Sequence, residues 1–179
     1  MTPVTMLFLL VAGTAMQLLL PAVPWLGYAT APMLGAIVLY YALYRGGLVM
    51  LFAAIIAGLF QDSSSLIPLG YSSFAFAVIA LVVERFRDLM ILRSAFTHMV
   101  LTAAVHVVVT ALLMILMLRD GIIDGQPGLM LLKLPGAAVL GLIAGPLVIG
   151  AACSLEEKTG LIQGDADRYG ATRSFYGIG

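Results

Sequence analysis

Charged side chains are scarce in this sequence, at 10% of the 179 residues, and nine acidic residues balance nine basic ones. Soluble domains carry about 25% charged residues, so this chain has too little polar surface to fold in water. The zero net charge also removes any electrostatic basis for binding nucleic acid. With 62% hydrophobic residues and a mean hydropathy of +1.09, the chain is instead suited to solvation by lipid.

Cysteine is almost missing as well, because Cys153 is the only one in the sequence. A single cysteine excludes an internal disulfide and a cysteine metal cluster. We interpret Cys153 as a small apolar residue within a helix, which is a common role for cysteine outside disulfides. The length allows one compact helical bundle and leaves no room for a separate soluble domain.

Long apolar runs make up most of the chain. A helix needs about 20 apolar residues to cross the hydrocarbon core of a bilayer. The sequence therefore predicts an all-α, polytopic membrane bundle of about six transmembrane helices in residues 1–155, and a cytoplasmic tail in residues 156–179. The apolar runs are Val4–Leu20, Trp25–Tyr44, Leu48–Phe60, Leu66–Val83, Ala95–Leu118 and Leu129–Leu155.

Three of these runs depart from a simple crossing. Leu48–Phe60 holds only about 13 apolar residues, so it predicts either a short crossing helix or a partly re-entrant segment. The last run is interrupted by Lys133, Pro135 and Pro146. After the first run, residues 29–31 resemble a signal-peptide cleavage site, but the start of the chain lacks the Lys or Arg that such a peptide needs, which favours a retained helix.

The basic residues are unevenly divided between the two sides that six crossings would create. With the N-terminus in the cytoplasm, the cytoplasmic side holds seven of the nine basic residues, and the outer side holds Arg119 and Lys133. The positive-inside rule therefore predicts a multi-pass protein of the bacterial inner membrane with both termini in the cytoplasm. Five crossings would invert the later segments and break the rule, so six are favoured.

Ionisable residues within membrane helices are costly, and they are therefore candidates for function. His98, Thr102 and His106 recur at four-residue spacing, which places them on one face of the fifth run. A proton or metal relay is one interpretation of this face. We favour neutral imidazoles that hydrogen-bond to a neighbouring helix, because a metal site needs three or four ligands and this helix offers two.

Asp62 follows the third run and precedes three serines, near the outer end of a short helix. One interpretation is a contact with a ligand or a partner protein. The other is a structural role, either as a cap for the following helix or as a solvated loop carboxylate. We favour the structural role, because short polar residues between helices are common caps.

Small residues recur every four positions in the sixth run, at Ala137, Gly141 and Gly145. Such a face lets two helix backbones approach closely, which is how membrane helices gain packing energy. The sequence predicts that this face packs either within the bundle or against another membrane protein. The sequence as a whole contains no nucleophile–base pair, phosphate loop or HExxH motif, so we predict no catalytic, cofactor or metal site.

The segment Gly58-Leu59-Phe60-Gln61-Asp62, followed by Pro68-Leu69-Gly70, resembles the MreD family of rod shape-determining membrane proteins. The length and the six predicted helices fit that family over the whole chain, although the tail is longer and richer in glycine. The resemblance implies a non-enzymatic part of the elongasome, the assembly for peptidoglycan synthesis. The implied partners are an MreC-like bitopic protein, the MreB cytoskeleton, the RodA glycosyltransferase and its penicillin-binding transpeptidase.

The same resemblance implies a fold similar to the substrate-binding subunits of energy-coupling-factor vitamin transporters, which supplies a second hypothesis. A vitamin site needs polar side chains that converge from several helices. In the predicted outer half they gather only from Asp62 to Ser73, which favours the scaffold over the transporter subunit. We expect the loop of Asp62, Pro68, Leu69 and Gly70 to fold into the outer mouth of the bundle or to contact a partner there.

Overall fold

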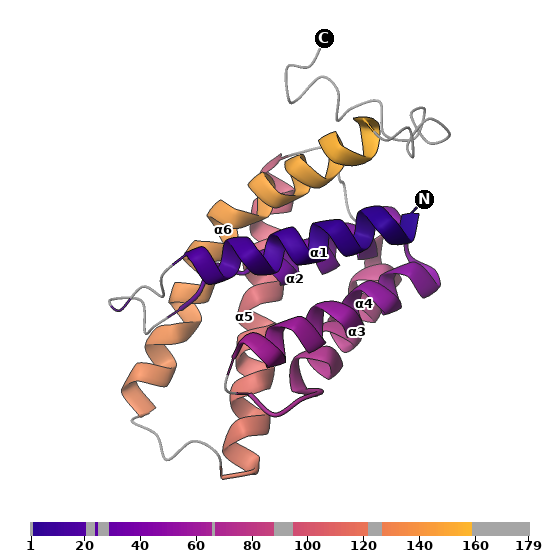
Figure 1. The fold of residues 1–179 in the computed structure, drawn as a ribbon. Coiled ribbons are helices and arrows are strands. Elements are labelled where there is room, and N and C mark those ends of the chain that lie inside the picture. The colour runs from indigo at the N-terminus through magenta and orange to yellow at the C-terminus, as the bar shows by residue number, and fades with distance from the viewer. Residues whose placement is uncertain are drawn as a thin grey trace.

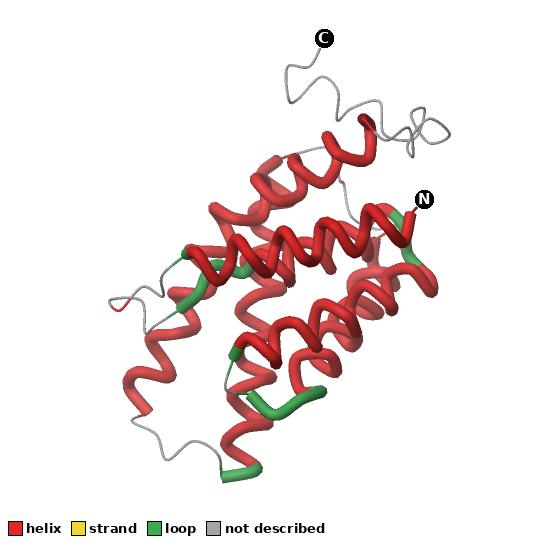
Figure 2. Tube along the Cα trace, in the orientation of Figure 1, coloured by secondary structure: helices red, strands yellow, loops and turns green. Residues whose placement is uncertain are grey.

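The computed structural model describes residues 2–20, 24, 29–65, 67–87, 95–121 and 127–158, which form six helices joined by loops (Figures 1 and 2). The predicted all-α class is therefore confirmed. The helices are α1 (Thr2–Leu19), α2 (Met33–Tyr44), α3 (Gly47–Ser64), α4 (Tyr71–Phe86), α5 (Ala95–Arg119) and α6 (Pro127–Lys158).

Within the described residues, three segments are long and apolar enough to cross a membrane, namely Gly47–Ser64, Phe96–Arg119 and Leu132–Glu156. The first of them is the whole of α3, an unbroken helix of 18 residues that reaches beyond the apolar run into the polar residues after Phe60. At a rise of about 1.5 Å per residue it extends for about 27 Å, close to the thickness of the hydrocarbon core. This length favours a crossing helix over a re-entrant segment.

Helix α2 forms the centre of the bundle, where it contacts each of the other five helices. Every residue from Leu34 to Leu43 is buried, because this helix is apolar around its whole circumference. The prediction that the second helix begins near Trp25 is not matched by α2, which begins at Met33; Trp25 itself lies outside the described residues. With 12 residues, α2 extends for about 18 Å, so the longer helices project past it.

The other helices surround α2 largely as two antiparallel pairs, α3 with α4 and α5 with α6. Helix α6 continues through Pro135 and Pro146, and Figure 1 shows that it bends along its length. A proline removes one helical hydrogen bond and commonly causes such a bend, but membrane helices tolerate it. The prolines that interrupt the apolar pattern therefore bend this helix and do not end it.

The polar contacts between helices define two ends of the bundle. At the first, which we call the Arg45 end, the turn after α2 meets the last turn of α6 through Arg45 and Glu156. At the opposite end, the Asp62 end, the Gln17 amide donates to Gln61 Oε1 at 2.7 Å and links α1 to α3. Arg85 and Arg87 close α4 near the Arg45 end, as expected if successive helices alternate in direction.

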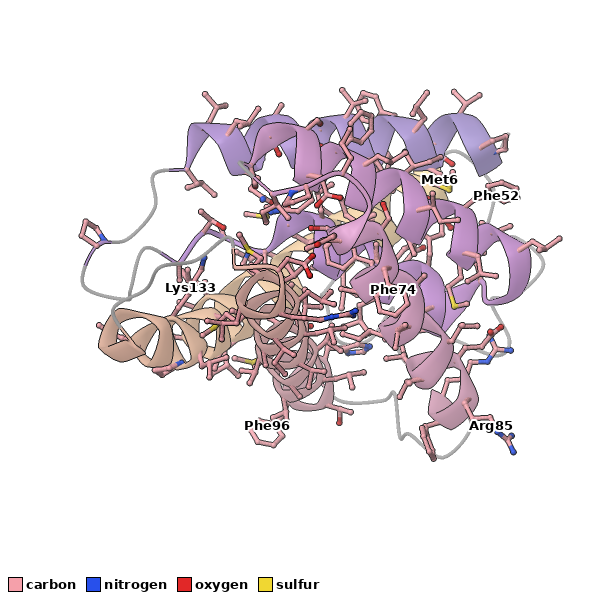
Figure 3. The ribbon with its side chains drawn as sticks, turned by 90° about the horizontal axis from the view of Figure 1, so that it is seen from below. Met6, Phe52, Phe74, Arg85, Phe96 and Lys133 are labelled. Carbon is pink, nitrogen blue, oxygen red and sulfur yellow. The ribbon has the colours of Figure 1, made fainter. Side chains whose placement is uncertain are left out.

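Large apolar side chains cover the outside of the bundle. Figure 3 shows Phe52 of α3 and Phe96 of α5 pointing away from the helices, and both are exposed. In water such a surface would drive aggregation, whereas lipid chains solvate it at no cost. The exposed aromatics and the three long apolar segments together identify a membrane protein.

Candidate functional site

The carboxylate of Asp62 lies at the N-terminus of α4. Its Oδ2 accepts the backbone N–H of Gly70 at 2.7 Å, and its Oδ1 accepts that of Ser72 at 3.1 Å. These are amides at the start of α4 that have no partner within the helix, where the positive end of the helix dipole also favours an anion. Asp62 is 2% exposed, so the favoured structural interpretation, a cap for the following helix, describes what its carboxylate does.

Gly58 allows the two helices of this hairpin to touch. A Cβ atom at Gly58 would lie 2.2 Å from the backbone N and Cα of Ser73, which is far inside van der Waals contact. The Ser73 hydroxyl donates to the carbonyl of Ile55 at 3.0 Å and adds a polar link at the crossing. The motif that resembles the MreD family is thus the set of residues that closes the α3–α4 hairpin.

The loop between α3 and α4 carries its other predicted residues at an exposed tip. Gly70 adopts a φ of 103°, a left-handed conformation that a side chain would strain, and it begins α4. Pro68 and Leu69 precede it and are exposed, Leu69 at 71%. The loop therefore combines a buried carboxylate, which fixes its base, with an exposed apolar tip.

Replacing Asp62 by alanine is expected to destabilise the hairpin. Both amides would lose their acceptor in a buried setting, which costs about 1–3 kcal/mol in the free energy of unfolding. For a chain of this size, that loss lowers the melting temperature by about 5 °C, measurable by thermal unfolding of the purified protein in mild detergent. The matched control is Ser63→Ala at the next residue, which is exposed. Equal melting temperatures for both variants would contradict the capping role.

A second group of polar side chains lies at the Arg45 end, and we call it the Glu156 cluster: Tyr40, Arg45 and Glu156. The Tyr40 hydroxyl donates to Glu156 Oε2 at 2.9 Å, and Arg45 Nη2 donates to the same oxygen at 2.7 Å. The Glu156 side chain is 1% exposed and that of Arg45 is 25% exposed. A buried carboxylate needs this kind of compensation, because burial without it costs several kcal/mol.

Glu156 also shapes the electrostatics of Arg45. Burial by itself lowers the pKa of the guanidinium, but the hydrogen bond and the attraction of the Glu156 carboxylate outweigh it and raise the pKa above the usual arginine value. Arg45 is a permanent cation at this end, as arginine side chains in proteins are. The predicted tail begins at Glu156, whereas this residue lies within α6 and is buried.

The histidine face of α5 is buried against α2 and α6. His98 Nε2 lies 3.1 Å from the hydroxyl of Tyr44 on α2, and the Thr102 hydroxyl donates to the His98 carbonyl. The His106 ring is packed so tightly that a Cβ at Gly35 would lie 2.4 Å from its Cε1 atom. The described residues contain no group of three or more His, Cys, Asp or Glu side chains that could hold a metal ion.

The small-residue face of α6 lies against α5. A Cβ at Gly141 would lie 2.9 Å from the Cα of Ala103, and one at Gly145 would lie 2.4 Å from the Thr102 hydroxyl oxygen. Ala137 on the same face is buried. These distances place the backbones of the two helices in direct contact, within the bundle, at the level of Thr102 and Ala103.

These features define a helical membrane protein whose polar side chains join its own helices. A family model described as rod shape-determining protein MreD matches residues 1–124. The chain belongs to this family, which confirms the resemblance found in the hairpin motif. The matched segment includes α1 to α5, and α6 follows it.

Membership of the MreD family gives the protein a role in determining rod shape. The family is one of structural membrane proteins and is not a known enzyme family. No curated protein matches the chain, and no solved structure matches it. A fold similar to the vitamin-binding subunits of transporters therefore stays a prediction.

Proposed function

We propose that this protein is a non-enzymatic scaffold of the elongasome in the bacterial inner membrane. It binds an MreC-like bitopic protein and, through it or directly, the MreB cytoskeleton, RodA and the penicillin-binding transpeptidase. Its action is to hold these partners at the sites of peptidoglycan synthesis. The observation that carries the proposal is the match to the MreD family over residues 1–124.

The use of polar groups in the bundle supports a scaffold. The Asp62 carboxylate binds two backbone amides, and the Ser73 hydroxyl binds a backbone carbonyl, so both serve the hairpin itself. The Glu156 carboxylate likewise joins α6 to Tyr40 and Arg45. A vitamin site would need such groups to converge on a ligand. The scaffold is therefore favoured over the substrate-binding subunit of a vitamin transporter.

The distribution of described basic residues supports the orientation that we propose. Arg45, Arg85 and Arg87 lie toward one end of the bundle, and the positive-inside rule assigns that end to the cytoplasm. Both termini would then be cytoplasmic, and the Asp62 end would face outward. In this orientation the exposed tip at Pro68 and Leu69 meets the extracytoplasmic part of a bitopic partner.

The proposal predicts that replacing Leu69 by serine weakens partner capture without weakening the fold. Leu69 is 71% exposed, so the change removes little internal packing, while a buried leucine at an interface contributes about 1.5–3 kcal/mol. We expect recovery of the MreC-like protein to fall about tenfold in native-membrane pull-downs in mild detergent, quantified by mass spectrometry. The matched control is Leu19→Ser, at an 80% exposed leucine that ends α1.

The same pull-down decides between the two functions. Recovery of a bitopic coiled-coil protein and cell-wall synthases with the unchanged protein supports the scaffold. Recovery of a transporter ATPase pair or a stoichiometric vitamin would overturn it. If the partners are recovered equally with Leu69→Ser and with Leu19→Ser, the scaffold stands and the loop tip is not its contact surface.

A further inference from the structure

The last turns of α6 pack on the core of the bundle through a face that includes a buried carboxylate. Ile149, Ala152 and Glu156 follow one another on one face of the helix, and all three are buried. Beyond Ile149, the fully buried side chains of this turn are an alanine and a carboxylate, and Cys153 and Leu155 are partly buried against the core. Apolar contact provides no hydrophobic drive between helices in a bilayer, so the bonds of the carboxylate add to the van der Waals packing that holds this turn.

Glu156 makes that attachment across a long stretch of sequence. Its Oε2 atom accepts from Tyr40, on the buried helix α2, and from Arg45, in the turn that leads to α3. The two donors lie more than 110 positions earlier in the chain. One carboxylate oxygen thus joins the end of α6 to two neighbouring parts of the bundle.

We propose that the bonds from Glu156 to Tyr40 and Arg45 form a conformational latch at the Arg45 end. With these bonds formed, the last turn of α6 stays on α2 and beside the turn that leads to α3. With the bonds broken, that turn leaves α2. The latch is a property of the fold that goes beyond the scaffold role and does not depend on which partners bind.

The two side chains of the ion pair differ in their exposure to water, and this difference determines how the latch opens. The Arg45 side chain is 25% exposed, whereas that of Glu156 is 1% exposed. An anionic group that approaches from the aqueous side therefore meets Arg45 first. Drawing Arg45 away separates the buried Glu156 carboxylate from this cation, and a buried charge without its counter-ion favours moving the turn into water.

The protein carries its own reporter for this motion. Cys153 is the single cysteine of the chain, it precedes Glu156 by three residues, and it is half-buried. Labelling of a protected thiol follows the population of locally open states. The rate at which a water-soluble maleimide labels Cys153 in the full-length protein, in mild detergent, therefore measures the open latch.

Glu156→Gln is expected to increase the labelling rate about tenfold, because the side chain keeps its size but loses charge-assisted hydrogen bonds. Tyr40→Phe keeps the ion pair and is expected to increase the rate about threefold. The matched control is Glu84→Gln, because Glu84 lies at the same end and accepts the Gly47 N–H without contributing to this cluster. We expect its labelling rate to equal that of the unchanged protein.

Three results would overturn the latch: unchanged labelling in Glu156→Gln, an equal increase in Glu84→Gln, or equal rates in the unchanged protein and Tyr40→Phe. If Glu156→Gln is not monodisperse, Tyr40→Phe decides the matter. Exchanging the charges in the double variant Arg45→Glu with Glu156→Arg is expected to lower the rate below that of Arg45→Glu alone. Labelling in denaturing detergent should be equal for all variants, which confirms that the thiol itself is unchanged.

Discussion

A protein with leucine in place of Gly58 is expected to lose the α3–α4 hairpin. Even the first carbon of a side chain would lie 2.2 Å from the backbone of Ser73, and backbone atoms cannot rotate away as a side chain can. Overpacking in a core costs about 1–3 kcal/mol when neighbouring side chains adjust, and more when they cannot. We expect a loss of at least about 3 kcal/mol, seen as a small monodisperse fraction in size-exclusion chromatography after extraction in mild detergent.

The matched control for this change is Phe52→Leu on the same helix, where the side chain is exposed and faces outward (Figure 3). We expect this variant to be extracted like the unchanged protein. Gly58→Ala is expected to fall between the two, because a single methyl group already meets Ser73. If Gly58→Leu remains monodisperse and melts like the control, the close approach of α3 and α4 is wrong.

The helices themselves could be predicted because the bilayer imposes a simple requirement on sequence. Each membrane helix satisfies its own backbone groups and needs only a long apolar run, so the runs and the observed helices coincide in order and number over the described residues. Their ends were less predictable. Helix α3 includes Gln61 and Asp62, which are polar but point into contacts with α1 and α4.

The role of the hairpin motif could be predicted only in part. A short polar residue between two apolar runs indicates a cap, and Asp62 does accept backbone amides of the next helix. For the close approach at Gly58, the four-residue spacing of Ala53 and Ala57 before it indicates close packing. The spacing does not indicate which helix packs there. Which residues touch a partner stays a prediction, since exposure at Leu69 describes an open surface and not its occupant.

The Glu156 cluster could not be predicted, and the reason is sequence distance. Tyr40 and Glu156 are separated by 116 positions, and the carboxylate stands where the apolar run gives way to polar residues. From sequence, that change of composition indicates exposure to solvent, which predicts that the bundle ends at Leu155. In the structure α6 continues to Lys158, and residues 159–179 of the predicted tail lie outside the described residues.

Glycines allow close backbone approach in both helix pairs, α3 with α4 and α5 with α6. Gly58 lets α3 meet the backbone of α4, and Gly141 and Gly145 let α6 meet α5. Close approach increases van der Waals contact, which is the main source of helix association where lipid competes equally well for apolar surface. The α3–α4 and α5–α6 pairs thus depend on small residues more than on any polar link. We therefore expect the α5–α6 pair to be as sensitive to replacement of its glycines as the α3–α4 pair.

Replacing Gly145 by leucine is expected to separate α6 from α5. The new Cβ would lie 2.4 Å from the Thr102 hydroxyl oxygen and 2.6 Å from its Cβ, and Thr102 is fixed because its hydroxyl bonds the His98 carbonyl. Gly141→Leu is expected to act similarly through the backbone of Ala103. For either variant we expect a loss of about 3 kcal/mol and a melting temperature about 10 °C lower in mild detergent.

The control for this pair is Ala104→Leu, which also adds a leucine to the α5–α6 pair but at an exposed position of α5. We expect its melting temperature to be unchanged, because lipid or detergent accommodates the larger side chain. If Gly145→Leu and Gly141→Leu alter neither folding nor recovery of partners, the small-residue face is open to lipid and the packing of α6 on α5 is wrong. If folding is kept but recovery of partners falls, the face serves another membrane protein, which is the alternative that the spacing of Ala137, Gly141 and Gly145 left open.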